Sequence, residues 1–203
     1  MSAVVTPSET HEEEVAHGRG LGWYGMVFFI ASEAVFFANL IASYLYLRVR
    51  AGGAWPPPGT IGDAHVDKVL AAVNTVILLS SSFPMHYAGR SIARGNRAGL
   101  IRGLIGTIVL GVAFLSIQAF EYVSNGFGPS TNLFGSVFYT ITGFHGAHVS
   151  AGLLFLTVCL VRSIRGDFSK GKHFAVTAGE MYWHFVDAVW IVVVTSLYFT
   201  VGG

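Results

Sequence analysis

Five long apolar stretches restrict this chain to one class of fold. Each is at least as long as the roughly 20 residues that an α-helix needs to cross the hydrocarbon core of a bilayer. They cover approximately residues 21–47, 66–88, 100–120, 133–161 and 181–201. Only 11% of the residues are charged, well below the roughly 25% of soluble domains, so most of the surface must face hydrocarbon. The sequence predicts an all-α, polytopic membrane bundle with five transmembrane helices, in one domain over residues 21–203.

The basic residues are distributed unevenly between the two sides of these spans. Cytoplasmic loops of membrane proteins carry an excess of Lys and Arg. A cytoplasmic N-terminus puts nine of the twelve basic residues inside: Arg19, Arg90, Arg94, Arg97, Arg102, Arg162, Arg165, Lys170 and Lys172. We therefore expect a cytoplasmic N-terminus and a C-terminus on the outer side. Residues 1–20 lack the basic start and apolar run of a signal peptide, and we expect a disordered acidic tail there.

Small residues recur every four positions in two of the spans. Such stripes let helix backbones approach closely where no hydrophobic force drives helices together. The two stripes consist of Gly99, Gly103, Thr107 and Gly111, and of Gly143, Ala147 and Ala151. We predict that both face neighbouring helices.

One carboxylate and two histidines are expected at the same depth in the membrane. At about 1.5 Å per residue, Glu33 lies about 18 Å beyond the start of the first span, close to the bilayer centre. His145 and His148 reach a similar depth in the fourth span. A charged group at this depth is costly unless it is protonated, paired or near water. We predict that Glu33 hydrogen-bonds to His145 or His148 and fastens the first span to the fourth, in a buried polar cluster. Further polar members of this cluster are Asn39 and Ser43.

A second polar pair is expected in the last span. His184 and Asp187 are three residues apart and therefore share one face of a helix. We predict that they hydrogen-bond to each other or to a neighbouring helix.

The residue inventory argues against a redox cofactor in this chain. Cys159 is the only cysteine, which excludes an internal disulfide and a thiolate cluster. Only His145, His148 and His184 are expected deep in the membrane, too few for a bis-histidine haem plus a three-histidine copper site. A zinc ion on His145, His148 and Glu33 is the geometric alternative to a purely structural cluster; our prediction is no bound metal.

A net charge of +1 and the lack of basic, aromatic-interleaved runs predict no nucleic-acid partner.

Several long segments together carry a family resemblance. They read "GMVFFIASEAVFFANLIASYLYLR", "NTVILLSSSF", "QAFEYVSNGFGPSTNLFGSVFY", "GFHGAHVSAGLLF" and "YWHFVDAVWIVVVTSLYF". These segments resemble, in the same order, subunit III of the haem–copper cytochrome c oxidases. The resemblance runs from about Gly25 to the C-terminus.

The resemblance implies a non-catalytic membrane subunit of an aa3-type cytochrome c oxidase, with no catalytic residue in this chain. Its implied partners are the catalytic subunit I and subunit II, which hold haem a and copper. Cytochrome c is then the donor to the complex but not to this chain. Such a subunit stabilises the catalytic subunit, holds phospholipid in a cleft between its helices, and supports proton uptake during reduction of dioxygen to water.

The family's characteristic positions can be located in this sequence. They fall on the buried carboxylate Glu33, the histidine pair His145 and His148, Glu121 in "QAFEY", and Trp183, His184 and Asp187 in "WHFVD". The resemblance implies a lipid-binding or structural role for Trp183 and Glu121. Many members have seven spans, and this chain begins where their third would. It therefore resembles the short, five-helix prokaryotic form of the plasma membrane, in which one wall of the lipid cleft is absent.

Two alternatives remain at the level of the sequence. Quinol oxidases and nitric oxide reductases contain related third subunits, although "GFHG" and "YWHFVD" are more similar to the cytochrome c branch. An independent five-span transporter or proton channel is a different class, and the lack of internal repeats argues against it.

Within the oxidase interpretation, an ionisable group at mid-membrane suggests that Glu33 senses or passes protons.

Overall fold

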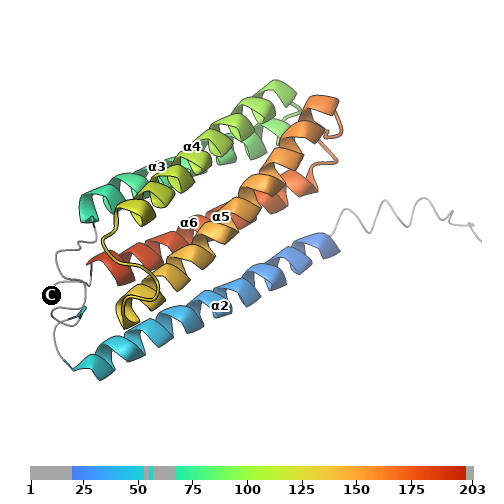
Figure 1. Cartoon of the computed structure of the whole chain (residues 1–203). Coiled ribbons are helices and arrows are strands. Elements are labelled where there is room, and N and C mark those ends of the chain that lie inside the picture. The colour runs from blue at the N-terminus through green and yellow to red at the C-terminus, as the bar shows by residue number, and fades with distance from the viewer. Residues whose placement is uncertain (1–19, 53–54, 57–66, 200–203) are drawn as a thin grey trace, which may run out of the picture.

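The chain forms five long helices in a computed structural model that describes residues 20–52, 55–56 and 67–199. The elements are α2 Leu21–Ala51, α3 Lys68–Ala93, α4 Arg97–Ser124, α5 Leu133–Arg165, α6 Phe174–Val194 and the short π-helix η1 Thr195–Phe199 (Figure 1). All five long helices, with η1 extending α6, are long and apolar enough to cross a membrane. This confirms the predicted five-span, all-α architecture. The acidic tail predicted for residues 1–20 falls, apart from Gly20, outside the described residues.

Short polar residues and glycines define the helix ends. Asp67, Asn96 and Asn132 each accept hydrogen bonds from backbone N–H groups in the first turn of α3, α4 and α5, at 2.7–2.9 Å. These contacts satisfy N–H groups that have no partner within the helix. Gly52 and Gly166 end α2 and α5 with φ of 64° and 91°, a left-handed conformation that glycine adopts without strain. The predicted breaks between the spans therefore have a local chemical cause.

The last helix starts earlier than its hydropathy predicts. α6 begins at Phe174 rather than near Met181. The residues in between, 174–180, contain Thr177 and the charged Glu180, and the charge of Glu180 lowers the local hydropathy. Glu180 nevertheless lies inside the helix because its carboxylate is paired with His86 of α3, 2.8 Å away. This partner on α3 offsets the cost of burying Glu180, the cost that made the predicted start of the last span fall too late.

Helices α3 to α6 form a closed ring. α3 packs against α4, α4 against α5, α5 against α6, and α6 against α3. Trp183 and Trp190 of α6 fill the interior and are completely buried. Their indole N–H groups donate to hydroxyl oxygens of α3, Ser81 at 2.8 Å and Thr75 at 3.0 Å. The ring is therefore held by close packing and by hydrogen bonds between helices.

The two predicted small-residue stripes behave differently. The α4 stripe is buried along its length. A Cβ atom placed on Gly103 would lie 2.6 Å from the carbonyl oxygen of Pro84, so glycine permits the close approach of α3 and α4. The α5 stripe does not pack in this way: Ala147 and Ala151 are exposed, and a Cβ on Gly143 would meet nothing within 4 Å. The prediction is confirmed for α4 and wrong for α5.

Helix α2 lies outside the ring and packs against α6 and α5 (Figure 1). In its most apolar 18-residue stretch only 6% of the residues are buried, against 56% in α6. Its buried side chains, Phe37, Ile41 and Tyr44, follow one narrow line along the helix. α2 therefore contacts the ring through a single seam and presents the rest of its surface outward.

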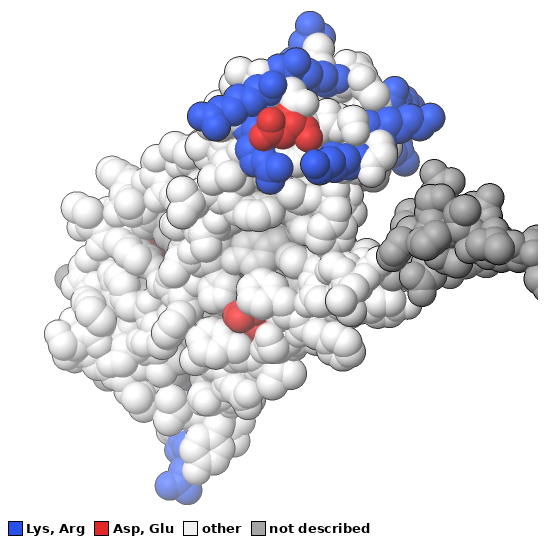
Figure 2. All heavy atoms as spheres, turned by 90° about the vertical axis from the view of Figure 1, so that its right-hand side faces the viewer, with Lys and Arg blue, Asp and Glu red and all other residues white. Residues whose placement is uncertain are grey.

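Charge is concentrated at the ends of the molecule. Figure 2 shows Lys and Arg gathered at one end, above a broad surface that is almost free of charge. The α3–α4 and α5–α6 connections both lie at one end of the bundle (Figure 1). Their basic residues, and those of the adjoining helix ends, are Arg90, Arg94, Arg97, Arg162, Arg165, Lys170 and Lys172. The N-terminal end of α2 lies at this same end (Figure 1), as the predicted cytoplasmic N-terminus requires; the orientation itself stays a prediction.

Candidate functional site: carboxylates and histidines between the helices

Glu33 of α2 and His148 of α5 form one polar contact across the seam. His148 Nε2 lies 2.9 Å from Glu33 Oε2. The rings of Phe36 and Phe37 lie against the imidazole, the latter at 4.9 Å between centroids. Both side chains are mostly covered, with 17% of the His148 side chain and 25% of the Glu33 side chain exposed. Of the two histidines that the sequence offered to Glu33, the structure pairs it with His148.

The hydrogen bonds of His148 determine where its protons lie. Its other ring nitrogen, Nδ1, is 2.7 Å from the carbonyl oxygen of Phe144. A carbonyl oxygen can only accept, so Nδ1 carries a hydrogen and donates it. The contact between Nε2 and Glu33 then needs one further proton, which lies either on the carboxyl group or on the ring. The pair therefore holds one exchangeable proton between α2 and α5.

His145 does not belong to this polar contact. Its side chain is completely buried, stacked on Trp190 at 4.8 Å and edge-on to Phe114 at 5.8 Å. Within the described residues, neither ring nitrogen has a hydrogen-bond partner. Three residues along a helix correspond to a rotation of about 60°, which turns His145 into the aromatic core while His148 faces α2. The prediction that His145 joins the cluster is wrong.

Asn39 and Ser43 also lie apart from the cluster. Both are exposed, and each hydrogen-bonds to a carbonyl oxygen one turn earlier in α2, that of Val35 at 2.9 Å and that of Asn39 itself at 2.8 Å. Asn39 is six residues from Glu33, which places it about 120° around the helix. The expectation that these two side chains belong to the buried cluster is wrong for this geometric reason.

His184 and Asp187 are joined through a third residue. Ser82 of α3 donates its hydroxyl hydrogen to Asp187 Oδ2, and its oxygen lies 3.0 Å from His184 Nδ1. Asp187 is 4% exposed. The two residues therefore bond to a neighbouring helix rather than directly to each other, which is one of the two arrangements that their spacing predicts.

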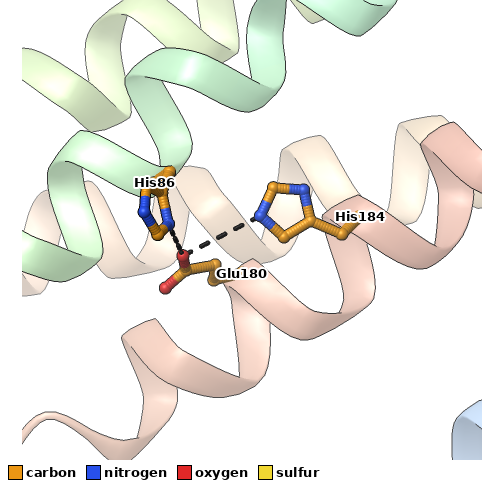
Figure 3. A group of neighbouring side chains, drawn as sticks. All are labelled: His86, Glu180 and His184. Atoms are coloured by element: carbon orange, nitrogen blue, oxygen red, sulfur yellow. Dashed lines mark hydrogen bonds and ion pairs between the residues drawn. The ribbon is translucent and has the colours of Figure 1, made fainter.

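Two further residues extend this group toward the basic end of the bundle. Figure 3 shows His86 of α3 and His184 of α6 pointing toward the carboxylate of Glu180. Oε1 of Glu180 is 2.8 Å from His86 Nδ1 and 3.8 Å from His184 Nε2. We call His86, Glu180 and His184 the α3–α6 triad. Sequence reasoning missed it because Glu180 fell before the predicted start of the last span, although Glu180 and His184 have the four-residue spacing of neighbours on a helix.

The triad also bears on the zinc alternative. Among the residues that the structure describes, it is the only set of three His, Cys, Asp or Glu side chains whose ligand atoms all lie within 4.8 Å of one another. His145, His148 and Glu33 do not form such a set. The zinc arrangement considered from the sequence is therefore not formed.

Trp183 and Glu121 occupy buried structural positions. Trp183 packs where Gly111 of α4 and Gly152 of α5 leave room for its ring. Glu121 is 2% exposed, and Oε2 accepts a hydrogen bond of 3.1 Å from the hydroxyl of Tyr198 in η1. The bond joins the end of α4 to the end of the α6–η1 helix. These contacts suit a structural role for both residues.

Two apolar grooves run between α2 and the ring. The larger, of about 510 Å³, lies between α2 and α6 and is lined by Ala34, Phe37, Ala38, Ile41, Ala42, Leu45, Phe185, Ala188, Val189 and Val192. The smaller, of about 250 Å³, is lined by Met26, Phe29, Ala151, Phe155, Ala178 and Tyr182. Glu33 lies between the two sets of α2 residues along the sequence. The surface on either side of the contact between α2 and the ring is thus grooved and almost entirely apolar.

Comparison with known proteins decides the family. The family profile described as "Cytochrome c oxidase subunit III" matches residues 2–201. The chain belongs to this family. Cytochrome c oxidase subunit 3 of Synechocystis is 42% identical over 98% of this chain and 83% of the relative. The protein of the same name from Thermostichus vulcanus is 41% identical over 86% and 85%, and that of Drosophila yakuba 38% over 90% and 70%.

Membership of the cytochrome c oxidase subunit III family defines the general setting of the chain. It is a multi-pass membrane subunit of a respiratory oxidoreductase complex, assembled with other oxidase subunits. Subunits of this family do not carry the metal centres of the oxidase. The side-chain contacts described above therefore belong to one subunit of an oxidase complex.

Proposed function

We propose that this chain is the non-catalytic subunit III of an aa3-type cytochrome c oxidase in a prokaryotic plasma membrane, with its basic end in the cytoplasm. It stabilises the catalytic subunit, retains phospholipid and supports proton uptake. The partner subunits hold haem a and copper and reduce dioxygen to water with electrons from cytochrome c. The chain itself contributes packing surface, lipid contacts and one proton-holding pair.

The observation that carries the lipid part is the position of α2. A helix that meets the ring along one seam leaves apolar grooves beside it. Acyl chains can fill such grooves at no cost in free energy, because lipid tails are as apolar as the leucine side chains that would otherwise close the grooves. The basic residues at the cytoplasmic end attract the phosphate groups of anionic lipids, at about 1 kcal/mol for each residue near the surface. The grooves and the basic end thus match the two ends of a phospholipid.

The proton part rests on the Glu33–His148 contact. Its single exchangeable proton lies near mid-membrane, where an ionisable pair with no function is costly to retain. A pair of this kind can accept or release a proton with little change in its surroundings, because both forms keep the same hydrogen bond. We propose that it tunes proton delivery to the catalytic subunit.

Filling the larger groove tests the lipid function. Ala38→Phe, which narrows the groove, should lower the phospholipid retained by the purified oxidase, as counted by mass spectrometry, and shorten its active life during turnover. Val35→Phe is the matched control, since Val35 lies on the same helix and is 61% exposed outside the groove lining. Equal lipid content in both variants and the parent would contradict the proposal.

Glu33→Gln tests the proton function. The amide keeps the size of the side chain but cannot exchange a proton, so we expect slower turnover and faster loss of activity in the assembled oxidase. Asn39→Leu provides a control on the exposed face of the same helix. Unchanged turnover, proton pumping and active lifetime in Glu33→Gln would remove the proton role and leave the pair a structural contact.

A further inference from the structure

We propose that the α3–α6 triad of His86, Glu180 and His184 binds a divalent transition-metal ion, for which Zn²⁺ is the best match. Two imidazoles and one carboxylate are a donor set that zinc accepts, with a fourth position left open for water or a partner group. The ion is not a redox centre. It joins α3 to α6 close to the basic end of the ring.

The separations of the donor atoms fit a single ion. Bonds of about 2.0–2.1 Å in a tetrahedral site place neighbouring ligand atoms about 3.3 Å apart. His86 Nδ1 and His184 Nε2 lie 2.8 Å and 3.8 Å from Glu180 Oε1, on either side of that value. The imidazoles come from two helices and the carboxylate lies between them (Figure 3). Side-chain rotations alone can therefore bring all three donors onto one ion.

Hydrogen bonds behind His184 direct its free lone pair at the site. Ser82 donates its only hydroxyl hydrogen to Asp187 Oδ2, so its oxygen accepts from His184 Nδ1–H. The neutral ring then has its lone pair on Nε2, the atom that faces Glu180. A carboxylate or carbonyl behind a metal-binding histidine fixes the tautomer in the same way, and here a serine relays the effect of Asp187.

With His184 neutral, the triad has no positive charge to balance the Glu180 carboxylate. The neutral ring presents a lone pair at Nε2 to the carboxylate oxygen 3.8 Å away, and two acceptors that face each other repel unless a cation or proton lies between them. A metal ion at this point satisfies both donors. It also takes the Nδ1 lone pair of His86, whose hydrogen moves to Nε2 of the same ring.

A glycine of α3 makes room for the carboxylate. A Cβ atom on Gly89 would collide with Glu180 Oε2. Gly89 is one turn beyond His86, so the carboxylate rests on the α3 backbone next to its histidine partner. The side chains of His86 and His184 are 50% and 42% exposed, and that of Glu180 is 19% exposed. The site is open on one side, which gives an ion a way in.

Zinc binding to the purified full-length oxidase, containing this chain, tests the proposal. Equilibrium dialysis against Zn²⁺ should find one site that Glu180→Gln and His184→Asn each weaken at least tenfold. His148→Asn, in the other histidine–carboxylate pair, is the matched control and should leave this binding unchanged. Binding that is equal in the parent, Glu180→Gln and His184→Asn would overturn the proposal.

The unaltered protein and a glycine variant provide a second, independent readout. X-ray absorption at the zinc edge of the loaded parent should show two imidazoles and oxygen ligands at about 2.0–2.2 Å; a spectrum without imidazole refutes the site even if the variants do not assemble. Gly89→Ala should weaken binding through displacement of the carboxylate while all three donors remain. Parent-like affinity in an assembled Gly89→Ala protein would contradict the role given to Glu180.

Discussion

The ring of α3 to α6 and the peripheral helix α2 are held by different kinds of contact. In the ring, glycines bring backbones together and tryptophans hydrogen-bond across helices. α2 meets the ring through a line of larger side chains and the Glu33–His148 contact. Helices in lipid are not driven together by water, so close approach and hydrogen bonds decide how tightly they pack. The ring is therefore closely packed, whereas apolar grooves remain beside α2.

The two histidine–carboxylate groups show the same contrast. The α2–α5 contact has two members and shares one proton. The α3–α6 triad has three donors, a relay through Ser82 to Asp187, and a glycine that accommodates the carboxylate. A single proton suffices for the first, whereas the second has enough donors for a metal ion. The number and direction of neighbouring side chains, rather than residue type, separate the two groups.

The largest difference between ring and periphery should appear at glycines. Gly103→Leu forces a side chain against the Pro84 carbonyl and should destabilise the ring by about 3 kcal/mol or more. Unfolding in mixed detergent micelles, followed by circular dichroism, measures this change. Gly25→Leu in the peripheral helix α2 is the control, since a Cβ there meets nothing within 4 Å. Equal stabilities of the two variants would contradict the claim that close backbone contact at glycine holds the ring together.

Trp183→Ala should have the next largest effect. Removal of the buried indole leaves a cavity between α4, α5 and α6 and takes away the hydrogen bond to Ser81. We expect a loss of about 2–4 kcal/mol in the same unfolding measurement, below the upper range for soluble proteins because lipid solvates the side chain in both states. Trp183→Phe keeps most of the volume and should cost about 1 kcal/mol. A larger cost for Trp183→Phe than for Trp183→Ala would refute this account.

A smaller effect is expected at the α2 seam. Glu33→Leu leaves His148 Nε2 without its partner and should reduce stability by about 1–2 kcal/mol. The change should also widen the distribution of distances between spin labels on α2 and α5, because α2 has few other attachments. Glu33→Gln retains a hydrogen bond and should keep the distribution narrow. If both variants resemble the parent, the pair does not hold α2 in place.

The smallest effects should come from the polar residues on the exposed face of α2. Asn39→Leu and Ser43→Ala remove side chains that bond only to carbonyl groups of their own helix. Each should change stability by no more than about 0.5 kcal/mol. A cost comparable to that of Glu33→Leu would show that these residues belong to the buried cluster after all.

Much of the architecture could be predicted from local properties of the sequence. Apolar length predicts five spans, and the spacing of Gly99, Gly103, Thr107 and Gly111 indicates the face on which α4 packs. Depth along a helix follows directly from residue number, which is why Glu33 and His148 were expected at one level. The start of α6 was misjudged because the cost of Glu180 depends on a partner in α3, which hydropathy does not register.

The sequence by itself determined the number of spans, the approximate depth of each polar residue and the family of the chain. Only the tertiary structure decided that His148 rather than His145 meets Glu33, and that Ser82 joins His184 to Asp187. The reason is geometric: each residue turns a helix by about 100°, so a small rotation of one helix against the next exchanges partners without changing any depth. Interhelical packing sets that rotation, and the α3–α6 triad exists only because α3 and α6 meet at His86 and Glu180.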